Sequence, residues 1–503
     1  MRFPRASGVL LHPTSLPGPH GSGDLGPAAH QFVDWLHAAG QSLWQMLPLG
    51  GIGAGNSPYM SSSAFAGNVL LIDLGELQRR GWLGPDALVA PPTGDAQRIA
   101  FETMVPYRMG KLADAASAFG QHASAADRAD FDAFVAAHAD WLADHALFMA
   151  LCEAHAWADW PAWPAGLAQR QAQALAAARV QFGQRIAFWQ FCQWCFFRQW
   201  AALRAYAHAM GVLVIGDAPI FIAHQSAEVW ARPDLFELDA SGVPTVVAGV
   251  PPDYFSASGQ RWGNPLYRWS AHAADGYAWW VQRVRRTLAL VDRVRIDHFR
   301  AIADCWEIPA DEPTAVHGRW LPGPGMALFE AINAALGPVP LIAEDLGLLS
   351  DAACALVADS GFPGMTILQF AFAGDASSAY LPHNHHHHSV VYTGTHDNNT
   401  SVGWWASASD HERHHARAYL GTDGHDIAWA VLRAAAASVA DTVVHPLQDI
   451  LALPAEHRMN LPGSASGWWV WRFEWSQLHP WHSQRLLDLT QLFGRLPAGS
   501  ALA

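Results

Sequence analysis

Lysine is almost absent from this chain of 503 residues, because only Lys111 occurs. A nucleotide-binding P-loop needs a lysine in the pattern G-x-x-x-x-G-K-[ST], and pyridoxal enzymes need a lysine that forms a Schiff base. Lys111 lies in the stretch GKLADAASAFG, which meets neither requirement. The sequence therefore excludes P-loop ATP hydrolysis and Schiff-base chemistry.

Positive charge is scarce as a whole, since 30 Lys and Arg residues face 44 Asp and Glu residues, a net charge of −14. An acidic surface repels phosphate backbones and anionic lipids, so neither nucleic acid nor membrane is an expected partner. No apolar run reaches the roughly 20 residues that cross a bilayer. The N-terminal stretch MRFPRASGVLLHPTSLPGPHG lacks a secretory h-region, so we expect a cytoplasmic protein, with no obligate protein partner evident.

Cysteine is sparse too, and five scattered residues predict no disulfide framework. Cys192 and Cys195 form a C-x-x-C pair inside an aromatic helical run, where buried thiols are expected. Residues 411–415 match the zinc pattern H-E-x-x-H, but we expect Asp410 to cap an exposed helix there, without a third ligand. The histidine run 385–388 is expected in a solvated loop. We predict no metal site.

Tryptophan, in contrast, is abundant, with 25 residues. Flat rings stack on the apolar faces of sugars, and tryptophan is seldom the simplest residue with which to fill a core. The composition therefore favours a carbohydrate ligand.

Eight short apolar runs each lead into polar residues, and stretches of helical period lie between them. Near-continuous apolar character is typical of parallel strands covered on both faces. The runs are SGVLL, LWQMLPL, GVLVIGDAPIFI, VDRVRIDHF, PLIAEDLG, MTILQFAF, SVVYTGTHDN and DTVVHPLQD. They predict an α/β fold, a (β/α)8 TIM-type barrel with its chemistry on the loops after the strands. The alternative, a doubly wound open sheet, lacks its fingerprint, because the G-x-G-x-x-G match at residues 21–26 lies too far beyond its strand.

The spacing of these runs is uneven and predicts large insertions. We expect a single catalytic barrel over residues 1–503, with an inserted helical subdomain at 75–205. A second long insertion at 218–290 is rich in Gly, Pro and aromatic residues, as expected of a long ordered loop.

Three acids follow three of the predicted strands: Asp297 in RIDHF, Glu344 in IAEDLG and Asp397 in THDN. Each is free to converge on one site at the carboxyl ends of the strands. Cleavage of a glycosidic bond with retained configuration needs two carboxyl groups about 5 Å apart, one to attack and one to protonate the leaving oxygen. Arg295 lies two residues before Asp297, so on a strand both point to the same face, and the cation should keep a nucleophilic carboxylate ionised.

At the level of motifs, the chain resembles the 4-α-glucanotransferases, the amylomaltases or disproportionating enzymes of the α-amylase superfamily. The segments that carry the resemblance run in order from about residue 7 to residue 472. They are HPTSLPGPHGSGDLG, GNSPYMSSSAFAGNVLLIDL, GDAPIFIAHQSAEVWARPDLF, VAGVPPDYFSASGQRWGNPLY, RIDHFR with WEIPA and TAVHGRW, IAEDLG, GFPGMTILQFAF, VVYTGTHDN and RMNLPGSASGWW.

The resemblance implies a role for each matching residue. Asp297 would be the nucleophile, Glu344 the general acid/base and Asp397 the third acid, which binds substrate hydroxyls and stabilises the transition state. Arg295 and His396 would support the cleaved bond. The residues that would line the glucan groove are Ser57, Tyr59, Asp253, Trp262, His298 and Asn460. The loop 248–263 would be a lid inside the second insertion.

The implied activity is transfer of α-1,4-glucan segments by double displacement. Donors would be maltooligosaccharides or amylose, and acceptors glucose or maltooligosaccharides, with no cofactor and no metal. Two departures from the family pattern occur: Ala54 stands where a tyrosine is usual, and Asn399 replaces an acid. An α-glucan hydrolase on the same barrel is the nearest alternative, and a sugar-binding protein without turnover is the alternative from another class.

Overall fold

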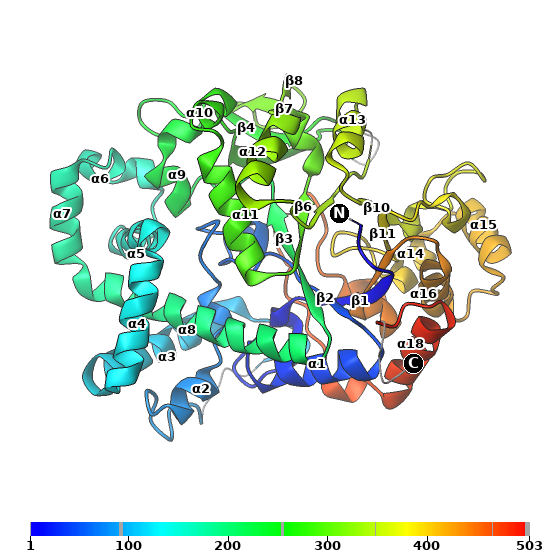
Figure 1. The fold of residues 1–503 in the computed structure, drawn as a ribbon, viewed down its shortest axis with the longest axis horizontal. Coiled ribbons are helices and arrows are strands. Elements are labelled where there is room, and N and C mark those ends of the chain that lie inside the picture. The colour runs from blue at the N-terminus through cyan, green and yellow to red at the C-terminus, as the bar shows by residue number, and fades with distance from the viewer. Residues whose placement is uncertain (1, 90–93, 253–255, 348, 465, 498–503) are drawn as a thin grey trace.

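Eight parallel strands form the central sheet of the computed structural model, which describes residues 2–89, 94–252, 256–347, 349–464 and 466–497. The strand order is β10-β11-β12-β1-β2-β3-β6-β9 (Figure 1). The strands are β1 Ala6–Leu10, β2 Leu43–Gln45, β3 Leu213–Pro219, β6 Arg293–Asp297, β9 Leu341–Ala343, β10 Gly364–Ile367, β11 Ser389–Tyr392 and β12 Thr442–Pro446. The N–H of Ala343, the last residue of β9, donates to the carbonyl of Pro363 just before β10 at 2.9 Å, which joins the two ends of the sheet. Each predicted run contains one of these strands, so the predicted barrel is confirmed.

Burial on both faces explains why these segments are apolar throughout. All five residues of β1 and all five of β12 are buried, because one face points into the barrel and the other meets the outer helices. Those helices are α1 Pro27–Ala38, α11 Ala278–Leu290, α12 Met326–Leu336, α13 Asp351–Ser360, α14 Ser401–Ser407, α15 Asp410–Leu420, α16 Ile427–Ala437, α17 Leu447–Ile450 and α18 Pro480–Leu492. Between β10 and β11, where every residue is described, the chain forms only short 3-10 turns instead of the expected helix. Of the helices described, none combines the length and the apolar character that a membrane crossing requires.

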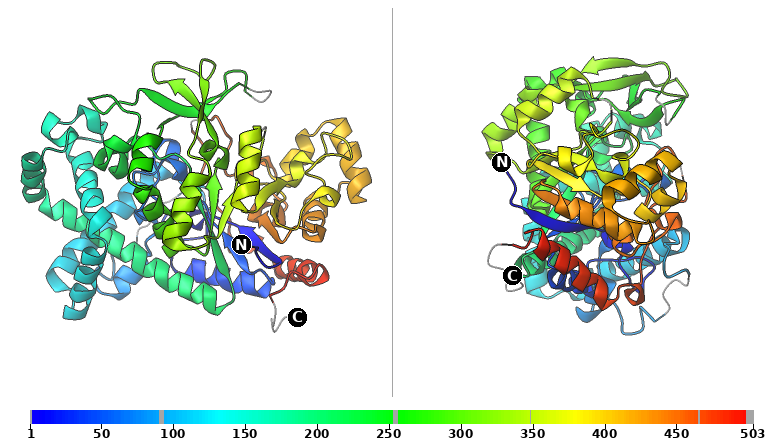
Figure 2. Two further views of the ribbon diagram at one scale, coloured as in Figure 1. Left: turned by 45° about the horizontal axis from the view of Figure 1, so that its top comes forward. Right: turned by 90° about the vertical axis from the view of Figure 1, so that its right-hand side faces the viewer.

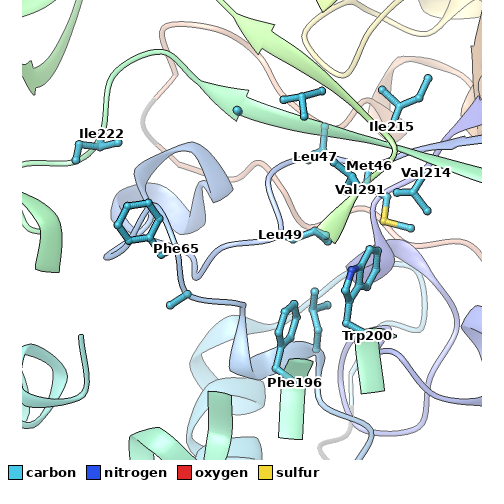
Figure 3. Close-up of a cluster of buried hydrophobic side chains, with 14 of the residues drawn as sticks. Met46, Leu47, Leu49, Phe65, Phe196, Trp200, Val214, Ile215, Ile222 and Val291 are labelled. Atoms are coloured by element: carbon cyan, nitrogen blue, oxygen red, sulfur yellow. The ribbon is translucent and has the colours of Figure 1, made fainter. Parts of the chain in front are cut away.

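Seven helices lie in the described residues between β2 and β3, and Figure 1 shows α4, α6 and α7 far from the strands. They are α2 Leu74–Arg79, α3 Phe101–His122, α4 Ala125–Ala137, α5 Ala139–Ala154, α6 Ala165–Ala168, α7 Ala172–Gln181 and α8 Gly183–Ala209. The long α8 returns to the barrel, where Phe196 and Trp200 pack near Val214 and Ile215 of β3 (Figure 3). Cys192 and Cys195 lie on this helix and are buried, as expected. The division into barrel and helical subdomain stays a prediction.

A second, antiparallel sheet in the order β5-β4-β7-β8 lies at the top of the left view in Figure 2. Its strands are β4 Val246–Val250, β5 Gln260–Pro265, β7 Asp304–Pro309 and β8 Arg319–Pro322, and the same insertion carries α9 Ala227–Ala231 and α10 Trp269–Ala274. Val247 pairs with Ile308, which lies beyond the next barrel strand in the sequence. The sequence analysis expected only a long loop here, because no local pattern reveals so distant a partner. The loop 248–263 is the hairpin between β4 and β5, and its residues 253–255 lie outside the described part of the chain.

Three buried histidines, His12, His145 and His445, make stability depend on pH. Burial lowers the pKa of each to about 3 from 6.5. Between these two pH values the three rings are protonated in the unfolded chain but neutral in the folded protein. The free energy of unfolding therefore falls as the pH falls from 6.5 toward 3. Each ring should contribute about 1.4 kcal/mol per pH unit inside that window.

We expect His145→Leu to reduce this pH slope by the contribution of one ring, measured as the free energy of unfolding in urea at several pH values. His411 is exposed and offers the control, because H411L should leave the slope as it is. An unchanged slope in H145L would contradict the assignment.

Candidate active site

The three predicted acids lie on one groove at the carboxyl ends of the barrel strands. Asp297 ends β6, Glu344 follows β9, and Asp397 lies beyond β11. The groove encloses about 1710 Å³, its open mouth included. The other predicted residues on its wall are Ser57, Tyr59, Trp262, His298, His396 and Asn460. Asp253, also predicted, lies outside the described residues.

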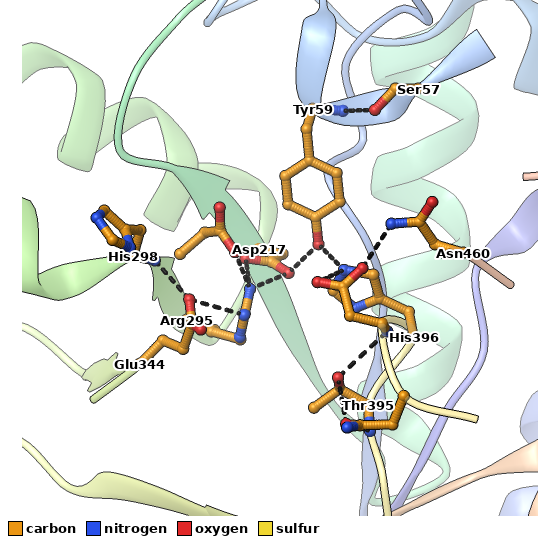
Figure 4. Close-up of polar contacts among 12 residues, drawn as sticks. Ser57, Tyr59, Asp217, Arg295, His298, Glu344, Thr395, His396 and Asn460 are labelled. Atoms are coloured by element: carbon orange, nitrogen blue, oxygen red, sulfur yellow. Dashed lines mark hydrogen bonds and ion pairs between the residues drawn. The ribbon is translucent and has the colours of Figure 1, made fainter. Parts of the chain in front are cut away.

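Arg295 links the acids from beneath the groove (Figure 4). Its Nη1 donates to both oxygens of Asp217, at 2.8 and 2.7 Å, and to Oδ1 of Asp297 at 3.0 Å. Its Nη2 lies 3.1 Å from Oε2 of Glu344. One planar guanidinium group therefore contacts both members of the predicted catalytic pair and holds their carboxyl groups close together.

The register of the sheet explains this convergence. Asp217 of β3 lies directly opposite Arg295 of β6, and Arg295 lies opposite Ile342 of β9, two residues before Glu344. Side chains two residues apart on a strand share a face, so all these groups meet on the same side. The side chains of Arg295 and Asp217 are 3% and 0% exposed, whereas those of Asp297 and Glu344 are 26% and 20% exposed. The pair reaches the groove while its partners stay buried.

The charges at this site are unequal, because three carboxylates share one cation. Burial raises the pKa of Asp297 well above its usual value, Arg295 opposes that rise, and Glu344 adds to it. Burial lowers the pKa of Arg295, but the three acids, Asp217 first, more than offset this and raise it. Arg295 was expected to keep the carboxylate of Asp297 ionised, but burial has the larger effect on its pKa. The shared cation therefore offsets the burial of Asp297 only in part.

The third acid is held from the opposite side of the groove. Asn460 Nδ2 donates to Oδ1 of Asp397 at 2.6 Å, and Arg458 donates to its backbone carbonyl at 2.7 Å. His396 Nε2 lies 3.4 Å from Oδ2 of the same carboxylate. Asp397 therefore presents oriented oxygens to the groove.

Two residues are set by local backbone geometry. Ser57 caps the short 3-10 turn Pro58–Met60, and its Oγ accepts from the N–H of Tyr59 at 3.2 Å. His298 has a positive φ of 51°, which costs roughly 1 to 2 kcal/mol for a residue other than glycine. In this conformation its backbone N–H donates to Oε2 of Glu344 at 2.5 Å, so the strain supports the orientation of that acid.

Sequence reasoning missed some groups and misplaced one. Asp217 lies in the predicted strand GVLVIGDAPIFI but was given no role, and Arg458, Trp468 and Trp469 were not singled out, although both tryptophans line the groove. Helix α15 begins one residue earlier than predicted, because Ser409, not Asp410, is its N-cap.

The zinc pattern has a structural role instead. Glu412, the glutamate of the H-E-x-x-H match, accepts from Ser409 N at 2.7 Å in a capping box. Its carboxylate therefore stabilises the start of helix α15. Within the described ranges, no cluster of three or more His, Cys, Asp or Glu side chains could hold a metal ion.

Paired acids bridged by an arginine, in an aromatic groove at the carboxyl end of a (β/α)8 barrel, are typical of enzymes that break and form glycosidic bonds. The family profile described as 4-alpha-glucanotransferase matches residues 11–478.

Individual relatives agree over their full length. The chain is 47% identical to the 4-alpha-glucanotransferase of Thermus thermophilus, over 99% of this chain and 100% of that one. It is 45% identical to the 4-alpha-glucanotransferase of Synechocystis, over 98% of each. The amylomaltase of Streptococcus agalactiae, solved in complex with acarbose, superposes with a TM-score of 0.95 at 37% identity, over 98% of this chain and 100% of that one. The chain belongs to the 4-alpha-glucanotransferase family, and its activity is the transfer of α-1,4-glucan segments.

Arg295→Met should destabilise the fold by about 3–5 kcal/mol, because it removes the partner of a buried ion cluster and leaves carboxylates unpaired. Arg232→Met is the control, since the ion pair of Arg232 with Asp234 is 46% and 57% exposed and should contribute less than about 1 kcal/mol. Urea unfolding at neutral pH measures both. Equal, small losses would mean that Arg295 does not balance the charge of the site.

Proposed function

We propose that Asp297 is the nucleophile and Glu344 the general acid/base of a retaining glucanotransferase that works by double displacement. The observation that carries this assignment is the shared guanidinium of Arg295, which holds both carboxyl groups at the groove. Retaining catalysis needs such a pair on one sugar-sized gap.

The two acids divide their oxygens in a way that suits these roles. Oδ1 of Asp297 accepts from Arg295, and Oε2 of Glu344 contacts Arg295 and the N–H of His298. Among the described residues, Oδ2 of Asp297 and Oε1 of Glu344 have no partner, so one oxygen of each acid is available to substrate. Oδ2 attacks the anomeric carbon, while the carboxyl group of Glu344 gives its proton to the departing 4-oxygen. The glycosidic bond breaks and a glucosyl ester of Asp297 forms.

The second half of the reaction determines that transfer prevails. Glu344, now ionised, takes the proton of an incoming sugar 4-hydroxyl, and that oxygen displaces Asp297 from the anomeric carbon. Water is present at about 55 M, so a sugar acceptor must be bound and water excluded. The hairpin 248–263 is the proposed lid. Trp262, at its described end, packs edge-on against His298 with ring centroids 4.8 Å apart, which places an aromatic wall beside Glu344.

The remaining predicted residues keep their proposed roles. Asp397 binds the hydroxyls of the distorted sugar, with Asn460 and His396 orienting it. Ser57, Tyr59, Trp262 and His298 bind glucan, and Asp253 is retained among them from the motif alone. The proposed donors are maltooligosaccharides and α-1,4-glucans, and the proposed acceptors glucose or maltooligosaccharides.

We also propose a reducing compartment, the cytoplasm, as the site of action. The support is that all five cysteines are free thiols.

Incubation with maltotriose tests the activity. We expect a ladder of longer and shorter oligomers with glucose, separated by chromatography. Shorter products alone would favour the hydrolase, and no change would favour a binding protein.

Asp297→Asn should lower turnover about 10⁴-fold or more while glucan binding is retained, because the variant keeps the shape of the side chain but loses the nucleophile. Glu344→Gln should likewise lower turnover in the maltotriose assay, because glutamine cannot donate the proton that the departing oxygen needs. The control is Asp345→Asn, since the carboxylate of Asp345 accepts from the N–H of Met365 and is absent from the groove wall. Substantial turnover by D297N would show that the nucleophile is misassigned.

A further inference from the structure

A directed chain of hydrogen bonds runs from Arg295 through Asp217 and Tyr59 to His396 (Figure 4). It begins at Asp217, whose side chain is completely buried and whose two oxygens both accept from Nη1 of Arg295. A carboxylate paired with a guanidinium is ionised and can only accept hydrogen bonds. Asp217 therefore sets the direction of every bond that follows.

The next member, Tyr59, has one proton to give. Its hydroxyl donates to Oδ2 of Asp217 at 2.7 Å and lies 2.8 Å from Nε2 of His396. Because the proton is used on Asp217, the oxygen of Tyr59 can only accept from His396. The Nε2 atom of His396 must therefore carry a hydrogen. The same atom is 3.4 Å from Oδ2 of Asp397, which is also an acceptor.

Packing holds His396 in this position. Its ring stacks on that of Tyr59, with centroids 5.2 Å apart and planes at 17°, and Trp469 contacts both rings. A smaller cavity of about 280 Å³, which His396 also lines, is bordered by His12, Ser15 and Gln448 and by no carboxylate among its described residues. No carboxylate in that cavity could therefore accept a hydrogen bond from the other ring nitrogen, Nδ1, and so favour a hydrogen there.

We propose that Asp217, acting through Tyr59, is a positioning residue that locks His396 in the Nε2-protonated tautomer, with its N–H donated to Tyr59 beside the third acid. The positive end of this N–H dipole then lies beside Asp397, with Nε2 3.4 Å from its Oδ2. The role of this donor in the reaction rests on the proposed function, but the tautomer is a property of the resting enzyme.

The tautomer is measured by long-range ¹H–¹⁵N NMR on the full-length enzyme labelled in its histidines, at a pH above their ordinary range. His396→Gln identifies the relevant signals among the 27 histidines. We expect the pattern of a neutral ring protonated at Nε2. A ring protonated at Nδ1 would overturn the proposal, whatever D297N does in the transfer assay.

Two variants test the lock itself. Tyr59→Phe keeps the stacking ring but removes the oxygen, and we expect a mixture of both tautomers. Asp217→Asn turns an acceptor into a donor toward Tyr59, which frees the tyrosine proton for His396 and should shift its ring toward the Nδ1-protonated form. Both should lower kcat/KM for maltotriose about 10- to 100-fold, the loss expected when a buried hydrogen-bond partner is removed.

Tyr392→Phe is the matched control. Tyr392 is as buried as Asp217, and its hydroxyl donates to Oε1 of Gln45 at 2.8 Å, away from His396. Its loss should leave the His396 signals unchanged. If Y59F kept the wild-type tautomer, or if Y392F disturbed it equally, Asp217 and Tyr59 would not be the lock.

Discussion

A single guanidinium group, that of Arg295, balances the charge of the whole site. It contacts three carboxylates in a place where water reaches only the two that face the groove. Taking these groups out of water is costly, and the cost is met only if the geometry is close to ideal. The parallel register of β3, β6 and β9 supplies that geometry, because it sets Asp217 opposite Arg295 and brings Glu344 to the same edge. One cation cannot neutralise three anions, and burial, which Arg295 offsets only in part, raises the pKa of Asp297.

The same arrangement shows how the fold prepares the site before any sugar arrives. His298 is held at a positive φ so that its N–H meets Glu344. Tyr59 is positioned by the Ser57 cap of its 3-10 turn, and its hydroxyl donates a hydrogen bond to Asp217. Such preorganised dipoles need not rearrange during the reaction, which is the usual source of electrostatic catalysis. Strain and buried charge reduce stability locally, and the large barrel core offsets both.

The antiparallel sheet carries the hairpin that we propose as the lid. Its hairpin is tied to the β7–β8 connection, where Arg261 Nη2 donates to the carbonyl of Ala310 at 2.8 Å and Ala315 N donates to that of Ser258 at 3.0 Å. The proposed lid is thus part of a second sheet in its described residues. Ala54 lies on the groove wall and offers only a methyl group there, whereas Asn399 is not on that wall and uses its Oδ1 to accept from Thr400 N. Of the two departures from the family pattern, one therefore lies on the groove and the other in a local turn.

By itself, the sequence determined the eight barrel strands and the acids at their ends, because both signals are local: an apolar run covered on two faces, and a polar residue at its carboxyl end. Its motifs also named most of the groove wall. It could not show that Asp217 is the partner of Arg295, that β4 pairs with β7, or that Ser409 and Glu412 form a cap in place of a metal site. The partner of Arg295 and the pairing of β4 with β7 depend on the register between segments far apart in the chain. The cap depends on whether Ser409 or Asp410 is the last residue outside the helix. Only the tertiary structure determines these contacts, because distant segments must first be brought together, at a cost in chain entropy, before they can interact.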